Sequence, residues 1–353
     1  GSGTPQVAQA QAPMNSASRQ QSGQSPPSAA TLAPQPGQRG GTTTPSAAFI
    51  AARSPVEAIP MPVSSSSPSG TAPGTVPTTD AGAAPPRLTD RTALLRQRAR
   101  AERLGREHWL DTMVQGEIED RLSEVNRAFT APAVVTGAPG FWAAAMPGAR
   151  IVADDPVLAL EPGAHDLVIH ALALHWADDP VGQIVQCARA LRPDGLFLGV
   201  LPGGRTLAPL REALAEAEIA ETGGLSPRVA PMGEIRDLGG LLARAGLALP
   251  VADQITQMVS YRGFPALARD LRAMGEGNAL AHRLRRPTRR AVLVRAAEAL
   301  ARIAPDPEEP GRIRVGFDLV FLTGWAPADS QPKPLRPGSA QMSLADALSQ
   351  RKP

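Results

Sequence analysis

Apolar and polar positions divide the chain into short segments whose periods alternate between those of helices and those of strands. The clearest succession lies within residues 166–204, where two continuous apolar runs flank a segment with helical spacing. A parallel pair of strands joined by a crossover helix has this pattern. The predicted elements are a strand at Leu167–Leu172, a polar break at His175-Trp176, a helix to Ala190, a turn at 192–195 and a strand at 196–201.

The same periods extend to both sides of this segment. Residues 87–128 carry apolar residues at helical spacing after a candidate N-cap, Thr89 or Asp90, and predict two helices packed over a sheet. A break is expected near Gly105 or Gly116. Further strands are predicted at 133–135, 151–153, 251–262 and 312–325, and further helices at 206–221, 234–246 (with Gly246 just past its end), 264–274 and 287–303.

This alternation predicts an α/β fold, a mostly parallel, doubly wound Rossmann-like sheet with helices on both faces. Composition indicates where this fold begins, because residues 1–86 are rich in Pro, Ser, Gly, Thr and Ala and hold few large apolar side chains. Such a segment cannot offset its ordering entropy, so a disordered arm is predicted. We therefore expect a disordered arm at 1–86, N-terminal helices at 87–130, the α/β domain at 131–330 and an extended tail at 331–353.

Charge and cysteine content exclude some classes of function. The formal net charge is +3 with a pI of about 9.7, and nearly all cations are arginine, which reflects genome composition or an anionic partner. Aromatic residues make up 3% of the chain, too few for stacking on single-stranded nucleic acid, so nucleic-acid binding is only a third hypothesis. One cysteine, Cys187, excludes an internal disulfide, and no spacing predicts a metal site. No apolar run reaches the length of a membrane span, and we expect a reducing compartment.

The turn after the first strand is a candidate nucleotide-binding turn. In a doubly wound sheet such a ligand lies at the carboxyl ends of the strands, beside a Gly-rich turn and the N-terminus of the next helix. Here the turn runs from Gly137 to Gly140, and Pro139 between them removes one N–H donor. The alternative is a turn with a structural role alone.

Asp154 and Asp155 end the second predicted strand and are the candidates for binding ribose hydroxyls. Only ten residues separate Asp155 from Asp166, whereas a crossover needs a dozen or more, so one βα unit is expected to be missing or replaced. The two aspartates could then follow the third strand of the parent fold and face an adenine amine. A third alternative is that both are solvated at the strand end.

His175 and Trp176 follow the strand at 167–172, at the edge of the sheet where a substrate would lie. His175 is a candidate general base or a group that orients the substrate, and Trp176 a candidate wall of the pocket. A histidine that only caps the next helix is the alternative.

The order of elements in 166–204, closed by Leu-Arg-Pro-Asp-Gly at 191–195, resembles the second half of class I S-adenosylmethionine (SAM) methyltransferases. More specific segments resemble one family, the methyltransferase-fold assembly factor 5 of respiratory complex I with its alphaproteobacterial relatives, over about 90–345. These segments are 173–176, 191–195, 223–231, 237–239 through 244–246, 270–278, 324–325, 330–334 and 338–340.

The resemblance implies a SAM-dependent fold that acts on a protein side chain, with arginine hydroxylation on a complex I subunit associated with the mitochondrial member. It places the chain in a bacterial cytoplasm, alternatively at the periphery of the inner membrane, or in the mitochondrial matrix of a eukaryote. The leading hypothesis is an enzyme that methylates or hydroxylates a protein. The alternative is a non-catalytic pseudo-methyltransferase that acts as an assembly chaperone or scaffold.

With the resemblance, the candidate site has three parts. The chain departs from the family's pattern in the cofactor part, because Val135 or Thr136 stands where an acidic residue precedes the turn, Pro139 lies in the turn, and the span to Asp166 is short. The expected cofactor residues are Gly137, Gly140, Asp154, Asp155, Ala171 and Leu172, the catalytic residues His175, Trp176 and Tyr261, and the substrate or partner residues Ser226, Arg228, Met274, Glu276, Asn278, Gln331 and Lys333.

Overall fold

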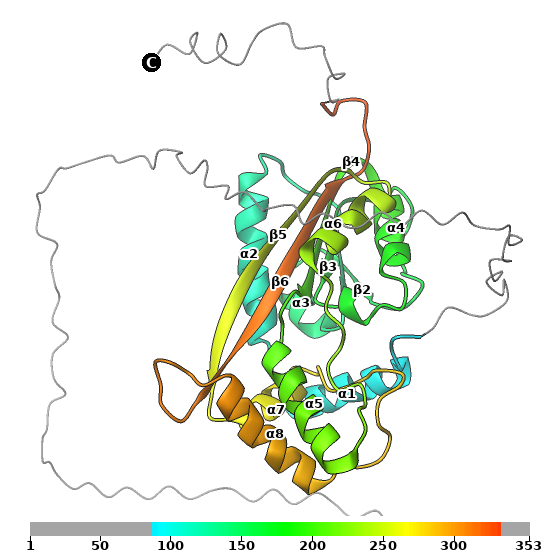
Figure 1. Cartoon of the computed structure of the whole chain (residues 1–353). Coiled ribbons are helices and arrows are strands. Elements are labelled where there is room, and N and C mark those ends of the chain that lie inside the picture. The colour runs from blue at the N-terminus through cyan, green and yellow to red at the C-terminus, as the bar shows by residue number, and fades with distance from the viewer. Residues whose placement is uncertain (1–86, 333–353) are drawn as a thin grey trace, which may run out of the picture. The chain divides into compact units, whose positions relative to one another are not determined.

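A single six-stranded sheet organises residues 87–332, the part of the chain that the computed structural model describes (Figure 1). The arm predicted at 1–86, and Lys333 with the rest of the tail, lie outside the described residues. The strand order is β2-β1-β3-β4-β6-β5. The strands are β1 (Pro132–Thr136), β2 (Arg150–Ala153), β3 (His165–Ala171), β4 (Leu191–Gly203), β5 (Ala248–Tyr261) and β6 (Ile313–Trp325).

The sheet is mostly parallel, as expected, with one reversed strand, β6. Strands β1 to β4 pair in parallel, but β6 runs antiparallel to β4 and β5 antiparallel to β6. The connection from β5 to β6 stays at one end of the sheet, so the chain returns without a crossover. The turn predicted at 192–195 lies inside β4 as an irregularity in the pairing with β3, with Asp194 at φ +62°.

One βα unit is missing at the β2 edge. Residues 154–164, all of which the structure describes, contain neither a helix nor a strand, and β2 has β1 as its neighbour. Asp154 therefore ends the strand beside β1. This is the position of the ribose-binding acid in a doubly wound sheet, and it excludes the alternative in which the two aspartates follow a third strand.

Helices cover both faces of the sheet. On one face α2 and α3 pack through residues such as Val114 and Trp142, and on the other α4 and α6 pack through Ile184 and Leu242. Helix α3, which follows the turn at Gly137, is an element that the sequence pattern did not predict. The helices are α1 (Arg91–Arg103), α2 (Trp109–Glu124), α3 (Pro139–Ala145), the 3₁₀ turn η1 (Leu174–Trp176), α4 (Pro180–Ala190), α5 (Ala208–Thr222), α6 (Ile235–Arg244), α7 (Phe264–Ala273) and α8 (Arg290–Ile303).

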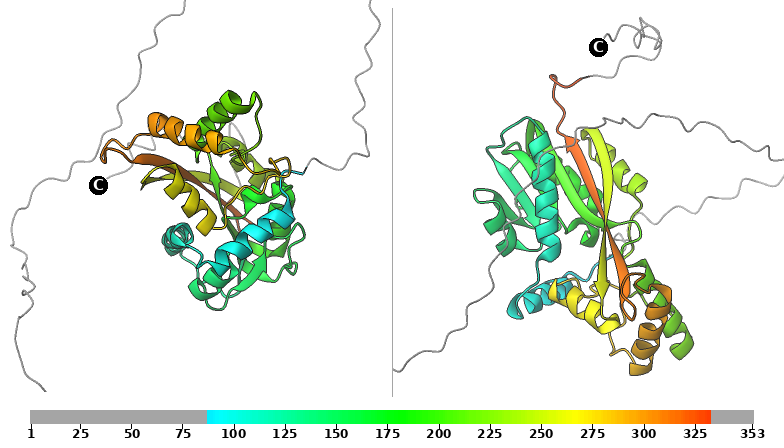
Figure 2. Two further views of the ribbon diagram at one scale, coloured as in Figure 1. Left: turned by 90° about the horizontal axis from the view of Figure 1, so that it is seen from below. Right: turned by 90° about the vertical axis from the view of Figure 1, so that its left-hand side faces the viewer.

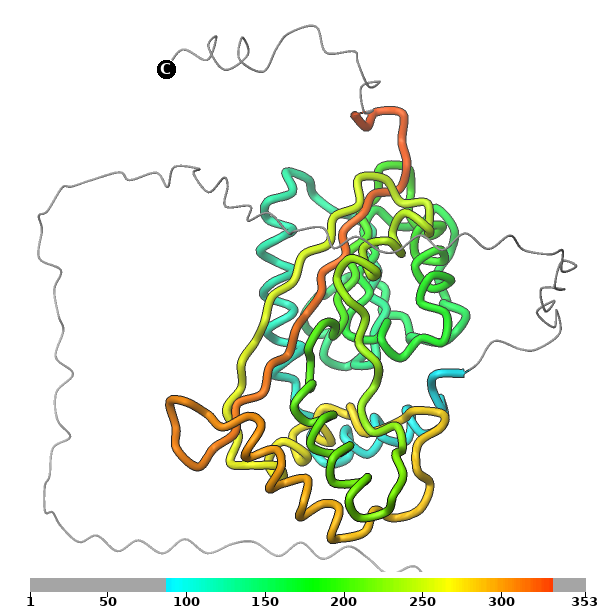
Figure 3. Tube along the Cα trace, in the orientation of Figure 1, coloured from blue at the N-terminus to red at the C-terminus, as the bar shows by residue number. Residues whose placement is uncertain are grey.

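Four helices, α1, α5, α7 and α8, gather at the end of the sheet where β4 ends and β6 begins (Figures 1 and 3). Helix α1 begins at the N-cap Asp90, as predicted, and the chain turns out of it at Gly105, which has φ +77°. Seen from below in Figure 2, α1 lies across the carboxyl ends of the parallel strands. These are the ends at which the candidate site was expected.

A buried histidine in β3 predicts a loss of stability in acid. Burial lowers the pKa of His170 to about 4, although the hydrogen bond to Gln183 opposes the shift. Because the unfolded chain takes up this proton first, the stabilising contribution is complete above about pH 6.5 and is lost as the pH falls toward 4. The expected loss reaches about 3 kcal/mol at the acid end of this window. Chemical unfolding of the wild type and of His170→Gln at a series of pH values measures this loss. The prediction would be contradicted if the free energy of unfolding fell equally steeply with pH in both proteins.

Candidate functional site

In the turn after β1, not every residue offers a ligand a free backbone N–H group. The Ala138 N–H donates to the Thr136 hydroxyl at 3.0 Å, and Pro139 occupies the first turn of α3, where a missing N–H breaks no helical bond. A side chain added at Gly140 would meet open space, whereas one at Gly137 would not. The difference between the two glycines comes from α1.

The side chain of Arg98, from α1, fills the space over Gly137. A Cβ atom at Gly137 would lie 2.2 Å from Arg98 Cζ. Arg98 Nη1 donates to both carboxylate oxygens of Asp154, at 2.8 and 2.9 Å, and the Arg98 side chain is 7% exposed. Arg106 Nη1 donates to the carbonyl of Gly137 at 2.8 Å. The backbone approach that a nucleotide would use is occupied by two arginines.

Asp154 is a buried carboxylate with two arginine partners. Besides Arg98, Arg91 Nη2 donates to it at 2.9 Å and also reaches Asp155. Burial by itself would raise the pKa of Asp154, but the hydrogen bonds and charges of Arg91 and Arg98 outweigh it and hold the pKa at about 2. The acid expected for ribose hydroxyls is thus ionised and already bound within the chain.

These residues do not fit SAM in the conformation described. The space left beside Gly137, Ala171 and Leu172 is about 30 Å³, whereas pockets for cofactors and drug-sized ligands measure roughly 300–1,000 Å³. The predicted cofactor residues do lie together at the carboxyl ends of the strands. They surround the guanidinium of Arg98, however, and not an open cofactor cleft.

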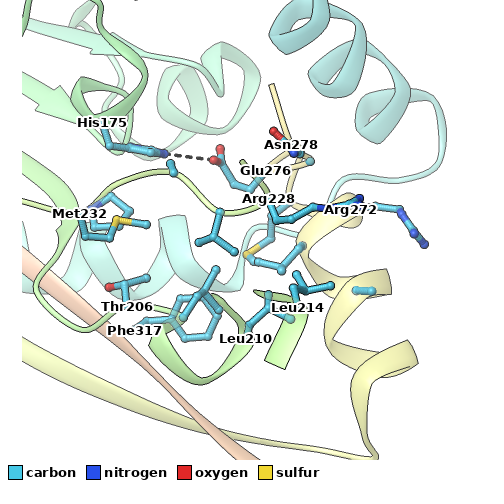
Figure 4. A pocket seen from close by; sticks show the side chains of 18 of the residues that line it. His175, Thr206, Leu210, Leu214, Arg228, Met232, Arg272, Glu276, Asn278 and Phe317 are labelled. Carbon is cyan, nitrogen blue, oxygen red and sulfur yellow. Dashed lines mark hydrogen bonds and ion pairs between the residues drawn. The ribbon is translucent and has the colours of Figure 1, made fainter. Parts of the chain in front are cut away.

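A second cavity, of about 230 Å³, adjoins the first and is mostly apolar (Figure 4). Its apolar wall comes from α5, β6 and α7, with residues such as Leu210, Leu214 and Phe317. Its polar groups come from η1, the turn before α5, the 223–231 loop, and α7 with the turn after it. His175, Arg228, Glu276 and Asn278 are among the residues expected in the site, whereas Thr206 and Arg272, which also line the cavity, were not expected there.

Glu276 is the central polar group of this cavity. Its Oε2 accepts a hydrogen bond from Trp176 Nε1 at 2.7 Å and lies 3.1 Å from His175 Nε2, which points at it in Figure 4. Burial would raise the pKa of Glu276, but His175, with help from Arg98 and Trp176, lowers it below its ordinary value. Both hydrogen bonds fall on Oε2, and within residues 87–332 no donor reaches Oε1. Glu276 is therefore a carboxylate with one oxygen free for a ligand.

The 223–231 loop is held against the cavity by a partly buried ion pair. Arg228 donates to Glu218 through Nε and Nη2, at 3.1 and 2.7 Å, and Ser226 donates to the same carboxylate. Asn278 Nδ2 donates to the carbonyl of Pro227 at 2.9 Å, which ties the loop to the turn after α7. Met274, from that turn, lines both cavities. Four of the expected substrate residues thus position the wall of the cavity, and Glu276 faces its interior.

Two expected site residues lie elsewhere. Tyr261 lines neither cavity, because its hydroxyl donates to Asp270 at 2.6 Å. Burial and this carboxylate raise its pKa, so it is no base at neutral pH. Gln331 donates to Asp194 and to the carbonyl of Ala326, at the opposite end of β4 from the two cavities. We withdraw the catalytic assignment of Tyr261 and the substrate assignment of Gln331.

Three residues of the site, Arg91, Arg98 and Arg106, were not predicted to belong to it. The excess of arginine was attributed to genome composition or to an anionic partner, and no arginine of this segment was assigned to the site. A usable signal was present, because Leu94, Arg98 and Ala101 fall at the i, i+4 and i+7 spacing of one helix face. An arginine in an apolar stripe is expected to be buried and paired.

Within residues 87–332, no group of three or more His, Cys, Asp or Glu side chains converges on a position suited to a metal ion. The helices described are all too short or too polar to cross a membrane.

Comparison with known proteins bears out the resemblance stated above. A family model described as a methyltransferase domain matches residues 142–199, a match that begins just after the Gly137–Gly140 turn. The mitochondrial arginine-hydroxylase NDUFAF5 of Danio rerio is 36% identical over 201 residues, which are 57% of this chain and 62% of that protein. A malonyl-[acyl-carrier protein] O-methyltransferase of Laribacter hongkongensis is 34% identical over 180 residues, 51% of this chain and 57% of that protein.

The chain spans about three-fifths of the length of these curated relatives. Among solved structures, phosphoethanolamine N-methyltransferase 2 of Haemonchus contortus in complex with SAM aligns with a TM-score of 0.33 and 12% identity, over 62% of this chain and 53% of that one. Together with the sheet topology, the sequence matches show a methyltransferase-like α/β fold and confirm the resemblance to the complex I assembly factors.

Proposed function

We propose that this methyltransferase-like protein works in respiratory complex I assembly as a non-catalytic factor that binds an arginine side chain of a protein partner. The observation that carries the proposal is Glu276, a carboxylate with a free Oε1 in a mostly apolar cavity. A guanidinium is planar and can donate two parallel hydrogen bonds to a carboxylate, while apolar walls suit its aliphatic stem. The name arginine-hydroxylase carried by relatives that share this part of the chain supports the choice of arginine over other cations.

The rival hypothesis is a SAM-dependent enzyme that methylates or hydroxylates the same side chain. It requires an open cofactor cleft beside Gly137, where Arg98 stands instead. The filled cleft favours binding without chemistry. A complex I subunit is the proposed partner, which places the protein in the matrix of a mitochondrion or, in a bacterium, in the cytoplasm beside the inner membrane.

Peptide binding tests the proposal. Arginine-containing peptides from complex I subunits are titrated into the full chain, and each is compared with the same peptide carrying lysine or citrulline in place of arginine. Charge-assisted hydrogen bonds contribute about 1.5–3 kcal/mol, so Glu276→Gln is expected to weaken binding of the arginine peptide by roughly 10- to 100-fold. Glu212→Gln, an exposed change on α5, is the matched control and is expected to bind as the wild type does.

Two results would count against the proposal. One is an affinity that stays the same when arginine is replaced by citrulline, which keeps the shape and loses the charge. The other is equal affinity of the wild type and Glu276→Gln for every arginine peptide that binds.

A further inference from the structure

Helix α1 is fixed across the cofactor cleft by several independent contacts. The N–H groups of Leu88 and Thr89 donate to the Asp178 carboxylate at 2.8 and 2.9 Å. Asp90, the N-cap of α1, also accepts from Arg283 at 2.8 Å. The apolar face of α1 packs through residues such as Leu94 into a small core cluster with Trp176 and Leu280. The position of Arg98 is thus set by the fold around it and not by the Asp154 pair alone.

The turn after α7 is shaped to admit α1. Gly275 has φ +86°, and a Cβ there would lie 3.3 Å from Arg98 Cγ. A Cβ at Gly277 would lie 2.8 Å from the side-chain amide carbon of Gln97. A side chain at Gly275 would also crowd the Arg98 backbone at 3.4 Å, whereas one at Gly277 would displace only the end of the Gln97 side chain, so the close approach of the helix depends mainly on Gly275.

Arg98 occupies the two places that a nucleotide cofactor of this fold requires. The first is the close approach to the backbone at Gly137, where its guanidinium lies. The second is the carboxylate at the end of β2, where it takes both oxygens of Asp154. Its Nε and Nη2 atoms are buried without a hydrogen-bond partner among the described residues, so Asp154 is its hydrogen-bonding partner there. Arg98 and a nucleotide cannot occupy this cleft together.

We infer that Arg98 of α1 is an internal occupant of the cofactor cleft, and that SAM or its product S-adenosylhomocysteine binds only when this side chain leaves. The apparent affinity for either ligand is then reduced by the fraction of molecules in which the cleft is open. Removal of the Arg98 side chain frees both Gly137 and Asp154. It therefore strengthens binding, the opposite of what loss of an ordinary ligand-binding arginine does.

Calorimetric titration of the full chain with S-adenosylhomocysteine tests this inference. The wild type is expected to show no saturable binding up to about 1 mM, and Arg98→Ala to bind at least about tenfold more tightly than that limit. Arg100→Ala, an exposed arginine on the same helix, is the matched control and is expected to behave as the wild type. Circular dichroism shows whether Arg98→Ala is folded. If it is not, Arg98→Gln, which removes the charge and shortens the side chain, is the second variant and is expected to gain affinity in the same direction.

Two results would overturn the inference. The first is wild-type binding with a dissociation constant below about 10 µM, which requires a cleft that is already open. The second is no gain in affinity for a folded Arg98 variant. Arginine-peptide binding at Glu276 is measured separately. Failure here removes the ground for a non-catalytic role but leaves arginine binding standing, and failure of the peptide titration leaves this inference standing.

Discussion

Replacing Asp154 with alanine is expected to lower the free energy of unfolding by about 3–5 kcal/mol, because it leaves Arg98 buried without its counter-charge. Chemical denaturation at pH 7 measures the change. Asp155→Ala is the matched control, since Asp155 is more than half exposed and, within residues 87–332, forms an ion pair with Arg91 alone; its expected cost is below about 1 kcal/mol. Equal costs for the two neighbouring aspartates would contradict the buried pair.

A double-mutant cycle separates the pair from the general effect of losing a charge. Asp154→Ala combined with Arg98→Ala removes both charges, and the double variant is expected to be more stable than the sum of the single changes predicts. The same ion pair predicts that the protein loses stability in acid. Because the folded pKa of Asp154 is held at about 2, its stabilising contribution is complete above the ordinary value of 3.8 and is lost as the pH falls from there toward 2.

Most of the sheet could be predicted from the sequence because its strands are continuous apolar runs. The strand β3, His165–Ala171, is buried on both faces in the structure, and such runs differ clearly from the amphipathic helices beside them. The missing βα unit could also be predicted, since the number of residues between Asp155 and Asp166 is too small for a crossover helix. These predictions rest on local period and on spacing, which a sequence displays directly.

Strand order and direction depend on contacts between distant residues, which explains where prediction failed. The position of Asp154 beside β1 and the reversed direction of β6 follow from pairing between segments. Gln331 was assigned to the substrate side because its motif resembles the family, but a motif does not specify the end of the sheet at which it lies. The structure places it beside Asp194.

Arg98 shows why the state of the cofactor cleft could not be predicted from the cofactor motif. The weak features of that motif, Pro139 and the absent acid before Gly137, lie on the sheet side of the cleft. The residue that fills the cleft comes from a helix about forty positions earlier, and arginines were considered there only through the overall composition. The i, i+4, i+7 stripe through Leu94, Arg98 and Ala101 was the observation that should have decided its burial.

Trp142 anchors the other side of the same turn. It lies on α3, three residues after Pro139, is fully buried, and donates through Nε1 to Asp111 of α2 at 3.2 Å. Its ring also packs edge-on against Phe141, with centroids 5.5 Å apart. Trp142 therefore connects α3 and the Gly137–Gly140 turn to α2.

Trp142→Ala is expected to lower the free energy of unfolding by about 3–5 kcal/mol, because it leaves a large cavity and removes the hydrogen bond to the buried carboxylate of Asp111. Trp142→Phe, which keeps most of the ring volume, is expected to recover the larger part of this loss. Chemical denaturation measures both changes, and hydrogen exchange at the amides of 137–141 measures the local effect, which is expected to be faster exchange in the alanine variant. A cost below about 1 kcal/mol for Trp142→Ala would mean that α3 is held by its connection to β1 and not by its packing on α2.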